Sequence, residues 1–216
     1  MNRGIGGSNY YADRYGDRDW RFYGPVLGSA LTHSAPGPIL DIGAGHGLLV
    51  ECALRWGLQC VGVDGSDHGV ALAAARGIEL IHSQLSEVLP FRESTFQTAF
   101  MNQVIEHLEP PVARRALDEG FRVLRPGGMI YVASPSRFNA EQRVADPTHI
   151  NLLAPSELHA MLRAAGFVVL RPFDKALYGR LGEIVFNRIQ FERLSSSANC
   201  LAFKPAATQP RNSELA

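Results

Sequence analysis

The 216-residue sequence has few cysteines, no excess of charge of either sign and no long apolar segment. An odd number of cysteines without CxxC pairing, Cys52, Cys60 and Cys200, argues against a disulfide framework or a zinc site and predicts reduced thiols. Basic and acidic residues number 21 each, so no overall positive charge indicates a nucleic-acid partner. No apolar run approaches the roughly 20 residues of a membrane-spanning helix, so we expect no membrane partner.

The length and composition predict one globular domain with short flanking segments. A chain of 216 residues is long enough for one hydrophobic core, and 46% hydrophobic and 19% charged residues are ordinary globular values. The first residues are polar and glycine-rich, unlike a secretory signal, so we expect the cytoplasm as location. We predict an N-terminal helical lid or cap over 1–35, a main domain over 36–204 and a flexible tail over 205–216.

From position 39 onward, short apolar runs alternate with segments of helical pattern. This alternation is typical of βαβ units and predicts a parallel sheet. The predicted strands cover 39–42, 59–63, 79–82, 98–102, 129–133, 167–171 and 199–203, and the predicted helices cover 47–56, 66–76, 111–124, 155–165 and 181–194.

A glycine-rich turn follows the first predicted strand. The strand Ile39–Ile42 runs into Gly43-Ala44-Gly45-His46-Gly47, and a helix follows. Because glycine lacks Cβ, such a turn lets backbone N–H groups approach a ligand closely. Asp64, 21 positions after Gly43, ends the second predicted strand, where an acid accepts hydrogen bonds from both hydroxyls of a ribose. The alternative is that Asp64 only caps the helix beginning near Ser66.

The details of this turn favour a nucleoside over a dinucleotide. The dinucleotide pattern GxGxxG requires a third glycine at position 48, where this sequence has leucine. Asp41 lies at the end of the first strand, where its charge opposes a pyrophosphate but attracts the ammonium group of a methionine moiety.

The pattern of the turn resembles the first motif of class I S-adenosylmethionine-dependent methyltransferases, and the resemblance continues along the chain. Similar segments are Leu89-Pro90-Phe91, Glu106-His107-Leu108 and Pro126-Gly127-Gly128. The resemblance implies an α/β fold: a doubly wound, Rossmann-like, seven-stranded and mostly parallel sheet with an antiparallel late strand and helices on both faces. It also implies S-adenosylmethionine as cofactor and methyl transfer as activity.

By similarity to this family, the residues that follow the strands bind the cofactor. Gln84 is expected at the adenine amino group, Leu85 as an apolar wall, and Asn102 and Gln103 on the methionine side. The complete expected set is Tyr11, Asp41, Gly43, Ala44, Gly45, Gly47, Asp64, Gly65, Gln84, Leu85, Asn102, Gln103 and His107.

Methyl transfer from a sulfonium is an in-line displacement that depends mainly on alignment in a dry pocket. A hydroxyl or protonated amine acceptor also needs a base, for which we select His149, because its segment follows the fifth strand at the rim of the sheet. The alternative is that His149 only shapes that loop. For His107 we expect a mainly structural role, ordering the chain after the fourth strand.

The segment from Gln103 to His107 resembles a metal-binding motif of some relatives. Some relatives carry a Glu-x-x-Glu-His metal set with a further histidine, but here Gln103 occupies the first position. An amide is a poor ligand for a hard divalent ion, so we expect no metal.

The aromatic stretch Tyr10–Tyr23 is expected either to close over the site as a lid or to pack on the sheet as an amphipathic helix.

The sequence therefore predicts a methyltransferase acting on an oxygen or nitrogen atom of a small molecule. One alternative is methylation of RNA or protein, for which arginines on one helical stretch, Arg114, Arg115, Arg122 and Arg125, offer a basic strip. Another is a cofactor-binding partner subunit without turnover. The identity of the acceptor and the oligomeric state do not follow from the sequence.

Overall fold

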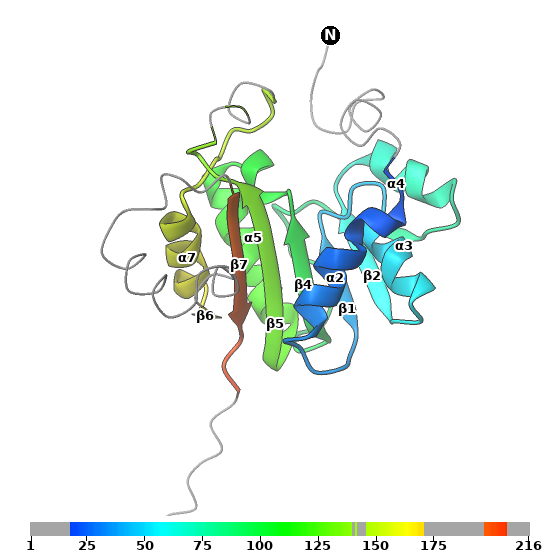
Figure 1. Ribbon diagram of the computed structural model, residues 1–216, viewed down its shortest axis with the longest axis horizontal. Helices are drawn as coiled ribbons and strands as arrows, with labels where there is room; N and C mark the ends of the chain where they lie inside the picture. Colours follow the sequence, from blue (N-terminus) through cyan, green and yellow to red (C-terminus); the bar gives the residue numbers. More distant parts are fainter. Residues whose placement is uncertain (1–17, 140, 142–145, 171–196, 207–216) are drawn as a thin grey trace, which may run out of the picture.

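A computed structural model describes residues 18–139, 141, 146–170 and 197–206 of the chain (Figure 1). In this part of the chain one sheet of seven strands has the order β3-β2-β1-β4-β5-β7-β6. The strands are β1 (Ile39–Ile42), β2 (Cys60–Asp64), β3 (Leu80–His82), β4 (Phe96–Asn102), β5 (Leu124–Pro135), β6 (Val168–Val169) and β7 (Ser197–Phe203). The helices are η1 (Trp20–Tyr23), α2 (Gly24–Leu31), α3 (Leu48–Arg55), α4 (Asp67–Ala74), η2 (Ile105–His107), α5 (Pro110–Val123) and α7 (Pro155–Ala164).

The strand directions confirm the predicted fold class. Strands β3, β2, β1, β4 and β5 pair in parallel, and β7 pairs antiparallel with both β5 and β6. From β1 the chain builds the sheet in one direction through β2 and β3. It then returns to the other side of β1 and continues through β4 and β5, so the strand order reverses between β1 and β4. In open α/β sheets, ligands bind outside the carboxyl ends of the strands at such a switch point.

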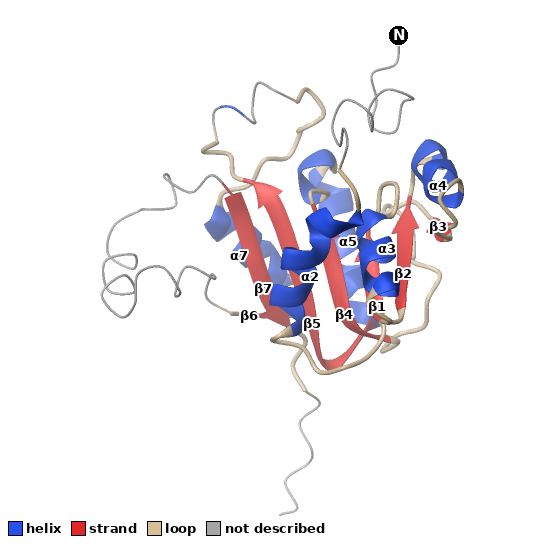
Figure 2. Cartoon of the chain, turned by 45° about the vertical axis from the view of Figure 1, so that its right-hand side comes forward, coloured by secondary structure: helices blue, strands red, loops and turns tan. Residues whose placement is uncertain are grey.

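Helices cover both faces of the sheet (Figure 2). On one face, α5 and α7 pack against a core that includes Leu117, Leu158 and Met101. On the other face, α2 and α3 pack around Leu27, Leu49 and Phe100. Helix α2 packs on the sheet directly after the aromatic stretch Tyr10–Tyr23. Most of that stretch belongs to residues 1–17, which lie outside the described part, so the choice between a lid and a packed helix stays a prediction.

The predicted elements agree with the structure apart from their ends. Strand β1 has the predicted bounds, whereas β5 begins at Leu124, five residues before the predicted start. Ser66 caps α4, since its side chain accepts a hydrogen bond from the Gly69 N–H at 3.1 Å. The predicted helix 181–194 and most of the predicted tail lie outside the described residues.

The three cysteines, all within the described ranges, form no disulfide. Among the described helices, none is both long enough and apolar enough to span a bilayer.

Candidate functional site

The turn after β1 brings bare backbone to the carboxyl edge of the sheet. Gly43, Gly45 and Gly47 have φ of +74°, +58° and +79°, a region that favours glycine. A Cβ atom at Gly43 would lie 2.5 Å from Cγ2 of Val104, so this position also excludes any side chain for lack of space. The turn therefore needs glycine for its conformation and for its close contact with the chain after β4.

Asp64, at the tip of β2, is joined to this turn. Its Oδ2 accepts a hydrogen bond from the Gly45 N–H at 2.7 Å, and its Oδ1 accepts one from the Ser66 N–H at 2.8 Å. Burial raises the pKa of Asp64, while these two backbone hydrogen bonds lower it. Because Ser66 caps α4, Asp64 is held by the backbone on both sides rather than acting as the helix cap, and its carboxylate lines a cavity.

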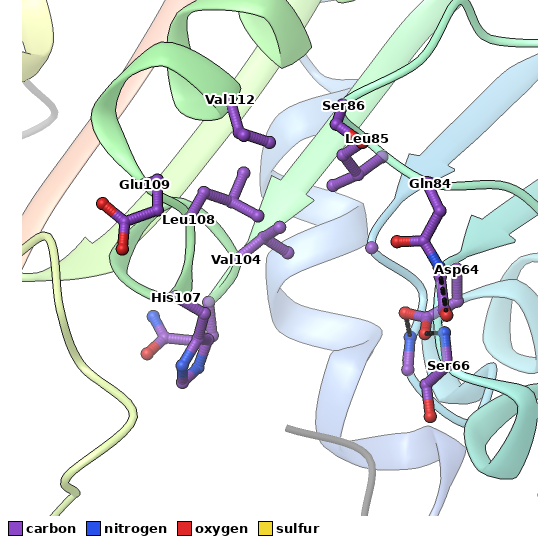
Figure 3. A pocket seen from close by; sticks show the side chains of 14 residues that line it. Asp64, Ser66, Gln84, Leu85, Ser86, Val104, His107, Leu108, Glu109 and Val112 are labelled. Atoms are coloured by element: carbon purple, nitrogen blue, oxygen red, sulfur yellow. Dashed lines mark hydrogen bonds between the residues drawn. The ribbon is translucent and has the colours of Figure 1, made fainter. Parts of the chain in front are cut away.

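The cavity beside Asp64 has a volume of about 370 Å³, within the usual range for small-molecule sites. Figure 3 shows Asp64, Ser66 and Gln84 on one side and His107 and Leu108 on the other, with Val104 between them. The wall combines polar groups near β2 with apolar side chains from the segments after β3 and β4. The lining residues are Gly43, Gly45, Asp64, Gly65, Ser66, Gln84, Leu85, Ser86, Gln103, Val104, His107, Leu108, Glu109 and Val112.

A second, smaller hollow lies around Asp41. Its lining includes Asp41 from β1, Asn102 from β4 and Tyr23 from the N-terminal segment. Burial, together with nearby Asp41, raises the pKa of Tyr23 to about 12, and the side chain of Asn102 acts in the opposite direction. Burial, with a further contribution from the charge of Asp64, raises the pKa of Asp41 to about 7. A buried carboxyl group whose pKa is raised by burial is stabilised in its charged form by a positively charged ligand group.

The structure brings most of the predicted residues to these two hollows. Residues 43, 45, 64, 65, 84, 85, 103 and 107 line the first, and residues 41, 43, 44 and 102 line the second. Gly47 lines neither and, with its positive φ, is the N-cap residue of α3. Tyr11 lies outside the described residues.

Apolar residues after β4 form a part of the wall that the sequence interpretation did not select. Val104, Leu108 and Val112 follow one another at intervals of four and all line the first cavity. An interval of four residues is typical of one face of a helix and could have drawn attention to these residues. However, Val104 and Leu108 precede the helix α5, which begins at Pro110. Gln103, just before them, has φ of +59°, a strained conformation that its N–H stabilises by donating to the Ala133 carbonyl at 2.7 Å.

Two histidines meet beside the first cavity. The ring centroids of His107 and His149 are 4.9 Å apart, and the Nε2 atom of His149 is 3.4 Å from Oδ2 of Asp146. The side chain of His149 is only 4% exposed and lines neither hollow, whereas His107 lines the first. The predicted catalytic role of His149 therefore stays a prediction, and its ring lies against that of His107.

The carboxylate of Glu106 lies close to both rings. The ligand-capable atoms of Glu106, His107 and His149 are within 4.8 Å of one another, the one such group of three among the described residues. The expectation of a metal-free site was based on Gln103 and stays a prediction.

Comparison with known proteins agrees with this geometry. A family model described as "Methyltransferase domain" matches residues 40–132, which contain the glycine turn, Asp64 and the segment after β4. A probable S-adenosylmethionine-dependent methyltransferase of Mycolicibacterium smegmatis is 30% identical over 172 residues, covering 77% of this chain and 62% of that protein. The chain is therefore similar to S-adenosylmethionine-dependent methyltransferases in sequence and in fold. The cofactor that this family and fold imply is S-adenosylmethionine.

Other similar proteins are known by function or by fold. A ubiquinone biosynthesis O-methyltransferase of Rhizobium etli is 31% identical over 150 residues, covering 61% of this chain and 60% of that protein. A SAM-dependent methyltransferase from Archaeoglobus fulgidus shares the fold, with a TM-score of 0.68 and 17% identity over 90% of this chain and 98% of that one. The chain thus spans about 60% of the length of the two curated relatives described above.

Proposed function

We propose that this protein transfers the methyl group of S-adenosylmethionine to an oxygen or nitrogen atom of a small molecule. The observation that carries the proposal is the Asp64 carboxylate, hydrogen-bonded to Gly45 in the glycine turn and lining a cavity of about 370 Å³. The turn, the acid and the cavity are the parts that a nucleoside requires: close backbone, a ribose acceptor and an apolar wall.

Each part of the cofactor has a corresponding group in the site. In our proposal Asp64 accepts hydrogen bonds from the ribose hydroxyls, and the segment of Gln84 and Leu85 holds the adenine. At the other end, Asp41 and Asn102 receive the methionine moiety, where the ammonium group meets a buried carboxylate. When bound, the cofactor supplies an electrophilic methyl group, and the protein aligns the acceptor and excludes water.

The small-molecule acceptor is supported by two observations. The Rhizobium etli relative is named for O-methylation in the biosynthesis of ubiquinone, a small molecule. In addition, two of the four arginines of the possible basic strip are engaged within the fold. Arg114 bonds Asp118 and the Ala164 carbonyl, and Arg122 bonds Glu119. Their contacts favour a structural role, so an RNA or protein acceptor remains the second choice.

The proposal is tested first by measuring cofactor binding and then by measuring methyl transfer to candidate acceptors. Calorimetric titration with S-adenosylhomocysteine is expected to give one site per chain, and an absence of binding would refute the proposal. Release of S-adenosylhomocysteine from S-adenosylmethionine is then measured with phenols, catechols and amines, with an RNA oligonucleotide and a protein extract as alternative acceptors. Binding without release for every acceptor would favour the partner subunit without turnover. We also propose the cytoplasm as the location of this activity.

A further inference from the structure

The side chain of His107 lies in the wall of the first cavity, at the end of η2. It is half-buried, and Figure 3 shows it on the side opposite Asp64 and Ser66. The loop that contains Thr148 and His149 is fixed against η2, since the Asn151 N–H donates to the Glu106 carbonyl at 3.0 Å and the Asn151 Nδ2 donates to the Ile105 carbonyl at 3.2 Å. The loop that surrounds the His107 ring is therefore held in place by hydrogen bonds to η2.

The hydrogen bonds around His107 determine which ring nitrogen carries the proton. Nδ1 is 3.2 Å from the Thr148 carbonyl oxygen, which can only accept a hydrogen bond. Nδ1 is also 3.0 Å from the Thr148 hydroxyl, which donates its own proton to Asp146 Oδ1 at 2.6 Å and so accepts from the ring. Both contacts require the proton on Nδ1, and the lone pair of the neutral ring is then on Nε2.

We propose that His107, rather than His149, is the proton acceptor for the methyl acceptor, held in the Nδ1–H tautomer by Thr148 and Asp146. This inference rests on the proposed methyl transfer. The arrangement follows the logic of a base whose second nitrogen is fixed by another group, here a threonine hydroxyl that connects the ring to a buried carboxylate. His149, beside Asp146 and 4% exposed, is a positioning residue in this account.

The proton transfer and the methyl transfer balance as one displacement. The O–H or N–H bond of the acceptor breaks and an Nε2–H bond forms on His107. The electron pair left on the acceptor forms the new bond to carbon, while the carbon–sulfur bond breaks and its pair goes to the sulfonium sulfur. The positive charge that leaves sulfur thus passes to a ring that has an oxygen of Glu106 within 4.8 Å and is connected through Thr148 to Asp146.

The first experiment reads the tautomer directly and needs no acceptor. Protein labelled with ¹⁵N in its histidine rings is studied by long-range ¹H–¹⁵N correlation, with His107 assigned from the spectrum of His107→Gln. We expect the proton on Nδ1 of His107, and a proton on Nε2 would overturn the proposal. A stoichiometric divalent metal that copurifies with the protein and is lost in His107→Gln would also overturn it, because the Nε2 lone pair would then bind the metal.

The second experiment compares access to the two rings. Diethyl pyrocarbonate attacks the unprotonated nitrogen of imidazole, and mass spectrometry locates the product. We expect modification of His107 before His149, with protection of His107 by S-adenosylhomocysteine, while exposed His33 serves as a control that the nucleoside does not protect. Modification of His149 alone would contradict the assignment. Failure of the nucleoside to bind would refute the proposed function but leave the order of modification to decide this inference.

The third experiment uses the acceptor with the highest rate of nucleoside release. His107→Gln is expected to lower kcat by about 10²–10⁴-fold, a larger factor than any change in the calorimetric affinity for S-adenosylhomocysteine. His149→Gln is expected to have a smaller effect on kcat, and His33→Gln none. A kcat of His107→Gln equal to that of the unmodified protein would overturn the proposal.

Discussion

Oδ2 of Asp64 is 2.7 Å from the backbone nitrogen of Gly45, so the end of β2 is tied to the turn that follows β1. These residues are 19 positions apart, and their two strands are neighbours in the sheet. One carboxylate therefore shapes the glycine turn and presents its remaining lone pairs to the cavity. This double role gives the first prediction.

Replacing Asp64 by alanine is expected to weaken binding of S-adenosylhomocysteine by about 1–3 kcal/mol, because charge-assisted hydrogen bonds to the ribose are lost. The measurement is calorimetric titration at constant pH. Asp67→Ala is the matched control, three residues further along and 96% exposed in its side chain. An unchanged affinity for Asp64→Ala would refute the role of Asp64.

Replacing Gly43 by alanine tests the close contact beneath the turn. The variant is expected to lower the free energy of unfolding by about 1–3 kcal/mol more than Gly57→Ala does, because its new methyl group meets Val104. Gly57 is the control with the same φ of +74° and no atom within 4 Å of a Cβ. Urea denaturation measures both.

The variant Val104→Ala makes this test specific. If the collision causes the extra loss, the double variant Gly43→Ala with Val104→Ala should be more stable than the sum of the two single changes predicts. Additive losses would show that backbone strain alone accounts for the effect.

The raised pKa of Asp41, about 7, predicts a pH dependence of stability without cofactor. The folded state holds this proton more tightly than the unfolded state, so the contribution of Asp41 to stability falls as pH rises from about 4 to about 7 and is then constant. Replacing Asp41 by asparagine removes this term. The stability of Asp41→Asn relative to the unmodified protein should therefore increase across this interval, as measured by urea denaturation at several pH values. A difference independent of pH would contradict the raised pKa.

Hydrogen bonds join Arg122 in α5 to the segment after β3, which contains the cavity residue Leu85, and we call this set of bonds the clamp. Arg122 donates to the carbonyls of Leu89 and Phe91 at 3.1 and 2.8 Å, and the Leu89 N–H donates to Glu119 at 2.7 Å. Arg122→Met is expected to cost about 1–3 kcal/mol of unfolding free energy, since these partly buried partners lose their donor. It should also weaken nucleoside binding several-fold, because the wall that includes Leu85 is less firmly held.

Arg115→Met is the control for this prediction, since Arg115 is an exposed residue of the same helix α5. Equal effects of the two substitutions would show that loss of charge, rather than loss of the clamp, matters. Unchanged stability of Arg122→Met would show that the clamp contributes nothing.

The parts of the fold that local patterns determine could be predicted from the sequence. Strand β1, the glycine turn and Asp64 are recognisable because a strand, a turn that needs glycine and a second strand follow one another within 26 residues, Ile39 to Asp64. The antiparallel late strand was expected from the family resemblance and not from local pattern, because strand direction depends on the route of the chain between β5 and β7.

The contacts between distant segments could not be predicted in the same way. Thr148 is 41 residues from His107, and Tyr23 is 79 residues from Asn102, so neither pair has a signal in local spacing. The choice of His107 or His149 as the proposed proton acceptor depends on which of the two rings lies at the cavity wall. That depends on how the loop after β5 packs on η2, which only the folded structure shows.

The most direct test of the account is a titration of the protein with S-adenosylhomocysteine, followed by a crystal structure of the complex. The account predicts one bound nucleoside per chain, its ribose hydroxyls on Asp64 and its amino group beside Asp41. A protein that gives no binding heat and no electron density for the nucleoside between Gly43 and Asp64 would contradict it.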